Sequence, residues 1–189
     1  SQKIRLHYPP ALFLDRDGVV NIDTGYAHKV SCLRLVAGII ELITFFRERS
    51  YLIIVVSNQS GIGRGYFKSE DVSRFNSAIN LELRRSGCQI DKFYFCPHKP
   101  LDNGRESCGC RKPRTGMLKK AEKDFNIDLS KSLLIGDNVT DILAAFNANL
   151  DRAYLLSQKR SEFLRKIKYN FRYVRCLKDV VCFERKLNL

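Results

Sequence analysis

Short runs of apolar residues alternate along this chain with segments whose apolar residues recur at helical spacing. Residues 11–18 (ALFLDRDG) begin as an apolar run and end in charge and glycine, and residues 51–56 (YLIIVV) are continuously apolar. Runs of this kind are typical of strands that are buried on both faces of a parallel sheet. Between them, the apolar residues of segment 36–46 share one face of a helix. This strand–helix–strand order indicates an α/β fold.

The alternation continues almost to the last quarter of the chain. It predicts helices over 69–86, 115–125 and 140–148, with Ser69 opening the first and Thr115 capping the second, and strands over 91–95, 133–135 and 152–156. Right-handed crossovers between parallel strands place helices on both faces of the sheet. We therefore expect one Rossmann-like, doubly wound parallel sheet, without a large cap domain, in a single domain over residues 1–189.

The residues that follow the predicted strands are the candidates for chemistry, because ligands bind beyond the carboxyl ends of the strands in such sheets. They are Asp15 and Asp17, the segment 57–59 and Asp137. Carboxylates gathered from separate strands repel one another unless a cation neutralises them. Mg²⁺ suits an all-oxygen site that keeps waters and a substrate phosphate. The sequence therefore predicts a magnesium site at this edge of the sheet.

The two aspartates of DRDG at 15–18, taken alone, are no more than an acidic pair at the start of a loop. Together with Ser57, with Lys112 in a later loop and with Asp137, they are the parts of a phosphoryl-transfer site. In such a site one aspartate attacks phosphorus, while a second carboxyl protonates the leaving alkoxide and later deprotonates water. The two aspartates can divide these roles.

Four motifs follow one another along the chain: DRDG at 15–18, SNQSG at 57–61, RKP at 111–113 and GDNVTD at 136–141. In this order they resemble the motifs of the haloacid dehalogenase superfamily. The resemblance implies that Asp15 is the nucleophile and Asp17 the general acid and base, and that Ser57 and Lys112 hold the phosphoryl group. It also implies that Asp15, the Asp17 carbonyl and Asp137 bind Mg²⁺, with Asp141 behind them.

Within that superfamily, FLDRDGVVN, DTGY and VVSNQSGIGRGYF resemble the phosphatases of heptose 1,7-bisphosphate. This implies a Mg²⁺-dependent phosphatase for a phosphorylated sugar, in the synthesis of the nucleotide-activated heptoses of bacterial surface polysaccharide. Histidinol-phosphate phosphatases are the alternative, because they share DRDG, NQ and the cysteine loop. The implied substrate contacts are Asp23, Thr24, Gly25, Tyr26, Ser57, Asn58, Gln59, Ser60, Arg111, Lys112 and Asn138. Asn138 stands where lysine or serine often occurs.

Cys96, His98, Cys108 and Cys110 lie in a loop without apolar periodicity, so nothing in the sequence buries these thiols. Cys108 and Cys110 are also too close in sequence for an unstrained disulfide. A Cys₃His set is an ordinary composition for zinc, and four protein ligands leave no open position for a catalytic water. We expect a structural Zn²⁺ in loop 96–110, as the resemblance also implies.

Composition limits the cellular setting. Hydrophobic residues make up 44% of the chain, as in globular proteins, and no apolar run reaches the roughly 20 residues that span a bilayer. The N-terminal residues lack the apolar core of a signal peptide. The seven cysteines, an odd number, argue against a secreted disulfide framework. We expect a cytoplasmic monomer that is not inserted in a membrane.

The net charge of +13 is concentrated near the C-terminus, where residues 152–189 contain 11 Lys and Arg against 3 Asp and Glu. A basic surface attracts nucleic acid, anionic lipid and phosphorylated small molecules alike. It suggests two other functions: a polynucleotide 3′-phosphatase with its groove in segment 166–175, or a non-enzymatic zinc module that binds nucleic acid. The second leaves the aspartates unexplained. We expect no nucleic-acid partner and assign the basic segment 157–189 no role.

Overall fold

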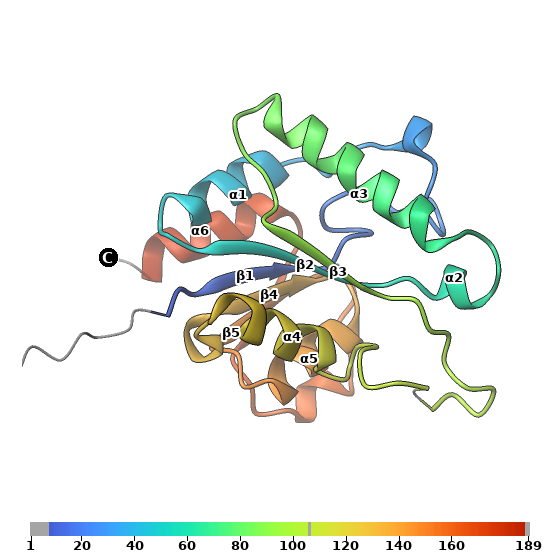
Figure 1. The fold of residues 1–189 in the computed structure, drawn as a ribbon. Coiled ribbons are helices and arrows are strands. Elements are labelled where there is room, and N and C mark those ends of the chain that lie inside the picture. The colour runs from blue at the N-terminus through green and yellow to red at the C-terminus, as the bar shows by residue number, and fades with distance from the viewer. Residues whose placement is uncertain (1–7, 106, 188–189) are drawn as a thin grey trace, which may run out of the picture.

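The structure is a computed structural model that describes residues 8–105 and 107–187. Residues 1–7, 106, 188 and 189, which fall within the predicted domain, zinc loop and basic segment, lie outside the described residues. Within the described part, six parallel strands form one sheet in the order β3-β2-β1-β4-β5-β6 (Figure 1). This is the Rossmann-like, doubly wound arrangement that the sequence predicts.

The strands are short, and most of their residues are buried. They are β1 Ala11–Leu14, β2 Leu52–Asn58, β3 Lys92–Cys96, β4 Leu133–Gly136, β5 Arg152–Leu156 and β6 Phe171–Val174. All residues of β1 and β4, at the centre of the sheet, are buried. The first five strands confirm the sequence-based expectation, whereas β6 was not predicted.

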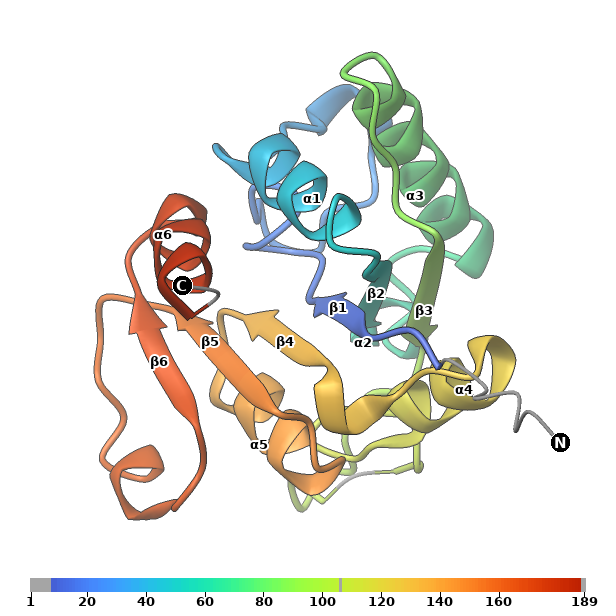
Figure 2. The ribbon, with the colours of Figure 1, turned by 90° about the vertical axis from the view of Figure 1, so that its left-hand side faces the viewer.

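Helices cover both faces of the sheet (Figures 1 and 2). One face carries α1 Ile39–Arg47, α3 Ser69–Arg84 and α6 Leu177–Leu187, and the other carries α4 Gly116–Phe125 and α5 Val139–Asn147. The short helix α2 Ser60–Gly63 follows β2, and 3₁₀ turns occur at η1 Val30–Cys32, η2 Leu129–Lys131 and η3 Leu164–Lys166.

The sheet separates two hydrophobic cores. Successive side chains of a strand point to opposite faces, so Leu12 and Leu14 belong to the core under α1 and α6, whereas Phe13 belongs to the core under α4 and α5. Val180 of α6 packs in the first core and Ile142 of α5 in the second. Because both faces are covered, the central strands are continuously apolar in sequence rather than alternating.

Two helix starts differ from the expected capping pattern. Helix α3 begins at Ser69, as expected, but its cap residue is Lys68, whose N–H donates to the Asp71 carboxylate at 2.8 Å. Helix α4 begins at Gly116, and the side chain of Thr115 makes no capping hydrogen bond. An acidic residue in the first turn therefore stabilises the start of α3 in place of a serine hydroxyl.

The basic C-terminal segment forms part of the fold, which the sequence did not predict. Strand β6 pairs with β5, and α6 packs on the sheet beside α1. The carboxylate of Glu184, 2% exposed, accepts hydrogen bonds from Arg152 Nε at 2.7 Å and from the Tyr154 hydroxyl at 2.5 Å. Glu184 thereby ties α6 to β5. Residues 171–174, which the polynucleotide hypothesis placed in a groove, are an edge strand.

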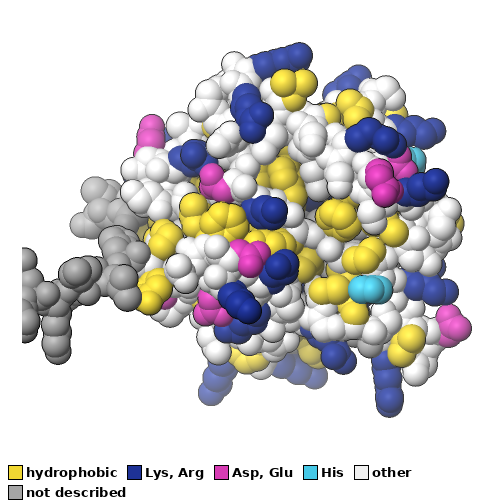
Figure 3. Space-filling model, in the orientation of Figure 1, with side chains coloured by type: hydrophobic (Ala, Val, Ile, Leu, Met, Phe, Trp, Pro, Cys, Tyr) yellow, Lys and Arg dark blue, Asp and Glu magenta, His cyan; other side chains and the backbone are white. Residues whose placement is uncertain are grey.

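The basic side chains are dispersed on the face seen in Figure 3. Lys and Arg lie there among acidic and hydrophobic side chains and do not form a single patch. Dispersed charge of this kind differs from the continuous basic groove that tracks a nucleic-acid backbone. In the described residues, no helix is both long and apolar enough to cross a membrane.

Replacing Glu184 by alanine should strongly destabilise the protein, because Arg152 and Tyr154 would lose their shared buried partner. We expect the free energy of unfolding, measured by urea denaturation, to fall by about 3–5 kcal/mol. The control is Glu82→Ala, which removes an exposed ion pair with Arg85 and should cost less than about 1 kcal/mol. Equal losses in the two variants would show that Glu184 does not hold α6 in place.

Candidate active site

The carboxyl ends of β1 and β4 meet where the chain order of the sheet reverses. Strands β2 and β3 lie to one side of this point and β5 and β6 to the other, so a ligand crevice is expected here. Leu14 pairs with Ile135, and the N–H of Asp15 donates to the Ile135 carbonyl at 2.9 Å. The register of the two strands therefore brings Asp15 to the end of the sheet at which Asp137 follows β4.

Two glycines leave room for aspartate side chains to pack directly against the backbone: Gly18 for Asp137, and Gly136 for Asp141. Gly18 has φ of +86°, a left-handed conformation, and a Cβ atom there would lie 2.1 Å from Oδ2 of Asp137. A Cβ atom on Gly136 would lie 2.2 Å from Cβ of Asp141. Any larger residue at either position would displace an aspartate of the site.

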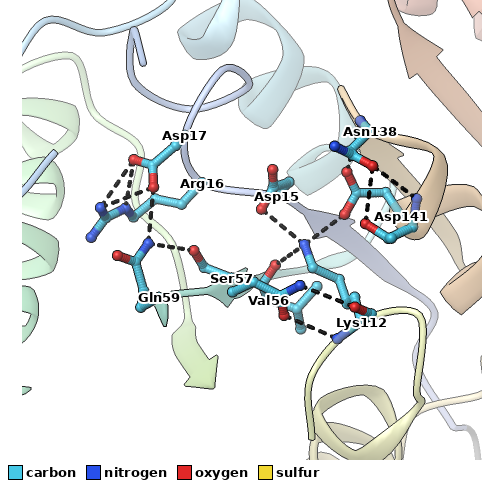
Figure 4. A network of polar contacts seen from close by, with 11 residues as sticks. Asp15, Arg16, Asp17, Val56, Ser57, Gln59, Lys112, Asn138 and Asp141 are labelled. Atoms are coloured by element: carbon cyan, nitrogen blue, oxygen red, sulfur yellow. Dashed lines mark hydrogen bonds and ion pairs between the residues drawn. The ribbon is translucent and has the colours of Figure 1, made fainter. Parts of the chain in front are cut away.

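Lys112 is the buried centre of the site (Figure 4). Its side chain is 3% exposed, and Nζ lies 2.8 Å from Oδ1 of Asp15 and 2.6 Å from Oδ1 of Asp141. Nζ also donates to the Val56 carbonyl at 2.7 Å, so three partners surround the three hydrogens of the ammonium group. This cation is therefore fixed beside the predicted nucleophile.

The Asn58 amide fixes the backbone of Lys112. Its Oδ1 accepts from the Lys112 N–H at 2.9 Å, and its Nδ2 donates to the Lys112 carbonyl at 3.1 Å. These two bonds join the end of β2 to the loop that carries Lys112. Asn58, predicted as a substrate contact, lines the cavity, and its side-chain amide also holds the Lys112 backbone in place.

Asp17 is engaged by a different set of side chains from Asp15. Its carboxylate accepts from Nε of Arg16 at 3.1 Å, from Nε2 of Gln59 at 2.9 Å and from Nδ2 of Asn21 at 3.0 Å. Gln59 also donates to Oγ of Ser57 at 2.7 Å. Figure 4 shows Asp17 beside Arg16 and Gln59 and apart from Lys112. The two aspartates of DRDG therefore occupy distinct environments.

Arg16 is a residue of this site that the sequence reasoning missed. It is fully buried, and besides Asp17 its guanidinium donates to Oδ1 of Asn76 at 3.2 Å and to the Ala27 carbonyl at 2.6 Å. It also lies 4.6 Å from the ring centroid of Phe75. An arginine between two aspartates gave a weak signal in the sequence, because most arginines are exposed. Its hydrogen bonds to the Asp17 carboxylate show that it fixes the orientation of that group.

A cavity of about 430 Å³ opens at these side chains, and most of the predicted site residues line it. They are Asp15, Asp17, Asp23, Gly25, Tyr26, Asn58, Gln59, Ser60, Arg111, Lys112, Asp137 and Asn138, joined by Thr140 and Asp141. Two predicted residues are not part of this lining. Ser57 is buried under Gln59, and Thr24 is exposed on the loop beside the cavity.

The site combines the buried carboxylate of Asp141, the half-buried carboxylate of Asp15 and the more exposed carboxylate of Asp137 with one ammonium group. Burial raises the pKa of Asp15 well above its usual range, although Lys112 opposes the shift. Burial and the repulsion of Asp141 raise the pKa of Asp137 to about 6. Burial disfavours charge on Lys112, but attraction to Asp141 and Asp15 outweighs it and raises the pKa of the ammonium group. The excess of negative charge favours a bound cation.

The geometry of the carboxylates fits a hard divalent cation. Asp15, Asp137 and Asp141 each offer an oxygen, and these oxygens lie within 4.8 Å of one another. Oxygen donors in such a group suit Mg²⁺. The Asp17 carboxylate is not in this group, whereas Asp141, expected behind the metal ligands, is part of it.

The second group of metal-ligating side chains is Cys96, His98, Cys108 and Cys110. The Sγ atom of Cys96 lies 3.5 Å from that of Cys108 and 3.1 Å from that of Cys110, and Nδ1 of His98 lies 3.4 Å from Cys110 Sγ. These separations exceed an S–S bond of ~2.05 Å, and the four atoms form a compact group with the composition of a structural zinc site.

Hydrogen bonds prepare one thiol of this group for metal binding. Burial opposes ionisation of Cys108, but hydrogen bonds, first among them that with Cys110, lower the pKa of Cys108 to about 6. Thiolates, and not thiols, bind metals. Burial raises the pKa of Cys96 and of Cys110, so the fit of the Cys₃His group to Zn²⁺ rests on its geometry and composition.

The cysteine loop is attached to the elements around the active site. The Cys96 carbonyl accepts from the Gln59 N–H at 2.8 Å, and the Pro97 carbonyl accepts from the Gly63 N–H at 2.9 Å. Arg111, directly after Cys110, donates to the His98 carbonyl at 3.4 Å. The loop thus places Arg111 at the cavity and leads the chain into Lys112.

This sheet, with an aspartate after its first strand and a buried lysine beside it, defines the class of haloacid dehalogenase-like hydrolases. Residues 109–180 match the HAD-hydrolase-like family. The solved structure of a D,D-heptose 1,7-bisphosphate phosphatase from B. bronchiseptica, complexed with magnesium and phosphate, aligns with a TM-score of 0.79 and 26% identity. The alignment covers 95% of this chain and 98% of that one.

Two proteins similar in sequence to this chain are named as heptose-bisphosphate phosphatases. The chain is 42% identical over 160 residues to the D-glycero-α-D-manno-heptose-1,7-bisphosphate 7-phosphatase of Campylobacter jejuni, covering 84% of this chain and 90% of the relative. It is 39% identical over 150 residues to the corresponding β-anomer enzyme of Yersinia pestis, covering 78% and 80%. The chain belongs to the heptose-bisphosphate phosphatase family of the haloacid dehalogenase-like hydrolases, and it is a phosphoric monoester hydrolase.

The close approach at Gly18 can be tested directly. Gly18→Ala would push Asp137 away from Asp15, and a misplacement of about 1 Å in a catalytic site lowers turnover by ~100-fold. The matched control is Gly87→Ala, since Gly87 has φ of +77° but nothing within 4 Å of an added Cβ. Phosphatase assays should show a large loss only for Gly18→Ala. Equal activity in the two variants would exclude this steric constraint.

Proposed function

We propose that this protein is a Mg²⁺-dependent phosphatase that removes the 7-phosphate of D-glycero-D-manno-heptose 1,7-bisphosphate through an aspartyl-phosphate on Asp15. The observation that carries the proposal is the contact of buried Lys112 with Asp15 at 2.8 Å, at the floor of a cavity that Asp17 also lines. A nucleophile, a fixed cation and a second carboxyl therefore share one cavity, as phosphoryl transfer requires.

Asp15 and Asp17 perform the two halves of the reaction. The Asp15 carboxylate attacks phosphorus while the bond from phosphorus to the sugar oxygen breaks, and Asp17 gives its proton to that oxygen. Asp17, now ionised, takes a proton from the water that attacks the aspartyl-phosphate. Inorganic phosphate leaves and Asp15 is regenerated as a carboxylate. Arg16 and Gln59 orient Asp17 throughout, because both donate to its carboxylate.

Lys112 and Ser57 are the proposed partners of the transferring phosphoryl group. The ammonium group of Lys112 offsets charge on the phosphoryl oxygens, and its fixed position avoids reorganisation during the reaction. Ser57 lies beneath Gln59, and its hydroxyl can still donate a hydrogen because the bond with Gln59 uses it only as an acceptor.

Asp15, the Asp17 carbonyl and Asp137 are the proposed Mg²⁺ ligands, with Asp141 held behind them by Lys112. When bound, Mg²⁺ would neutralise the gathered carboxylates and the phosphoryl oxygens and orient the two groups for attack. The raised pKa values of Asp15 and Asp137 reflect burial first, and excess negative charge second, so a cation would relieve part of this cost.

The substrate class is supported by the relatives and by the cavity. Both named relatives act, by their names, on heptose 1,7-bisphosphate, and one name gives the α anomer and the other the β anomer. Arg111 and Asn138 at the cavity, together with the loop 23–26, are the proposed contacts to the sugar and to its second phosphate. The planar guanidinium of Arg111 can bind a phosphate through two hydrogen bonds.

Zinc is proposed as a structural ion in loop 96–110. The support is the compact group of three Sγ atoms and one Nδ1, whose four donors fill a tetrahedral site. Such a site contributes folding free energy to a loop that has little apolar surface of its own to bury. The role of the ion would be to hold Arg111 and Lys112 at the cavity.

The proposed activity predicts fast phosphate release from heptose 1,7-bisphosphate in the presence of Mg²⁺. A panel with both anomers, histidinol phosphate and a 3′-phosphorylated oligonucleotide tests the substrate, and preference for either of the last two would overturn it. Asp15→Asn should remove turnover, since the amide cannot form the aspartyl-phosphate. Asp17→Asn should lower it by roughly 10²–10⁴-fold.

The control for these variants is Asp102→Asn, because Asp102 is exposed in the cysteine loop and is not among the residues that line the cavity. It should retain normal turnover. Full turnover by Asp15→Asn would rule out the covalent mechanism, whatever the preferred substrate.

The zinc proposal predicts about one zinc ion per chain in protein purified without chelators, measured by elemental analysis. Cys110→Ser should lose the ion and lower Tm by roughly 5–10 °C, because the loop then loses its tether. Cys182→Ser is the control, since Cys182 is an exposed thiol on α6. A chain that binds no zinc, or a Cys110→Ser variant that keeps it, would refute the assignment.

A further inference from the structure

Tyr26 is the one aromatic side chain among the described residues that line the active-site cavity. The other lining residues are polar, charged or glycine. Ligand sites commonly combine a few polar groups with aromatic surface, which packs against the apolar parts of the ligand. In a sugar phosphate those parts are the C–H groups of the ring. The ring of Tyr26 is therefore an aromatic surface in the cavity against which a sugar ring can pack.

The backbone at Tyr26 adopts an uncommon conformation. Tyr26 has φ of +51° and follows Gly25 with φ of +74°, so two successive residues are left-handed. A bulky residue rarely adopts this conformation unless the surroundings enforce it. The preceding turn is closed by the Asp23 carboxylate, which accepts from the Gly25 N–H at 2.8 Å. The chain thus turns sharply to direct the Tyr26 side chain.

Contacts after the turn keep this conformation in place. The Tyr26 carbonyl accepts a hydrogen bond from Nδ1 of His28 at 2.6 Å, and the imidazole stacks on Phe67 with centroids 4.6 Å apart. Buried Arg16 donates to the Ala27 carbonyl at 2.6 Å while it also binds Asp17. The loop is therefore fixed to the same arginine that orients Asp17.

Tyr66 supports the Tyr26 ring from outside the cavity. The two rings meet edge to face, with centroids 4.9 Å apart and planes at 83°. Tyr66 is not among the residues that line the cavity, and 58% of it is exposed. Its N–H donates to the Gly61 carbonyl at 2.9 Å, which anchors it to helix α2. A large aromatic side chain is thus kept at the surface in contact with the cavity wall.

We infer that Tyr66 is the positioning residue that holds Tyr26, one of the proposed substrate contacts, in the orientation in which the sugar ring packs against it. This inference rests on the proposed function and extends it to a residue that touches no substrate atom. The pair discriminates substrates that carry a ring from small phosphorylated compounds that carry none. The aspartates and Lys112 act on the phosphoryl group in both cases.

Steady-state kinetics with heptose bisphosphate and with acetyl phosphate, which has no ring, test this assignment. Tyr66→Ala should raise KM for heptose bisphosphate at least fivefold with a smaller change in kcat. The ratio of kcat/KM for heptose bisphosphate to that for acetyl phosphate should fall by a similar factor. Tyr66→Phe keeps the ring and should restore the wild-type ratio. Phe163→Ala is the control, because Phe163 is also 58% exposed and is distant in sequence from the loop.

A double-mutant cycle shows whether Tyr66 acts through Tyr26. If it does, Tyr66→Ala adds no further change in KM to Tyr26→Ala, because coupled residues are not additive. An additive effect, an equal loss on both substrates, or an unchanged KM in Tyr66→Ala would overturn the inference. The wild-type enzyme separates the two proposals: if it does not hydrolyse heptose bisphosphate, the proposed function fails and this inference falls with it.

Discussion

The buried ammonium group of Lys112 is the interaction on which the active site depends. An isolated charge in a protein interior is costly, so Lys112 requires Asp15, Asp141 and the Val56 carbonyl around it. Asp15 follows β1, Asp141 lies in the first turn of α5, Val56 belongs to β2, and Lys112 itself comes from the loop before α4. One side chain thereby fixes the relative positions of four segments at the carboxyl edge of the sheet.

The cysteine loop and the loop 23–28 extend this arrangement on two sides of the cavity. Backbone hydrogen bonds join the cysteine loop to the end of β2 and to α2, and its last cysteine, Cys110, leads into Arg111 and Lys112. The loop 23–28 is fixed through Arg16, which also orients Asp17. The groups proposed for phosphoryl transfer and those proposed for substrate contact therefore share anchors.

The sequence predicted the central strands because burial on both faces leaves an unbroken apolar run, as in β1 and β4. It missed β6 and α6 for a related reason. Strand β6 is an edge strand of four residues with an exposed Arg172, and α6 is apolar on one face only among many basic residues. Arg16 was missed because nothing local distinguishes a buried arginine from an exposed one.

By itself, the sequence determined the α/β class, the aspartates at the strand ends, the Cys₃His set and the family, since each depends on residue type, order and spacing along the chain. Only the tertiary structure decided which groups meet: Lys112 with Asp15 and Asp141, Glu184 with Arg152, and Tyr66 with Tyr26. Such pairs join residues far apart in the chain, and their contacts arise from strand register and from packing across the sheet, which no local pattern encodes.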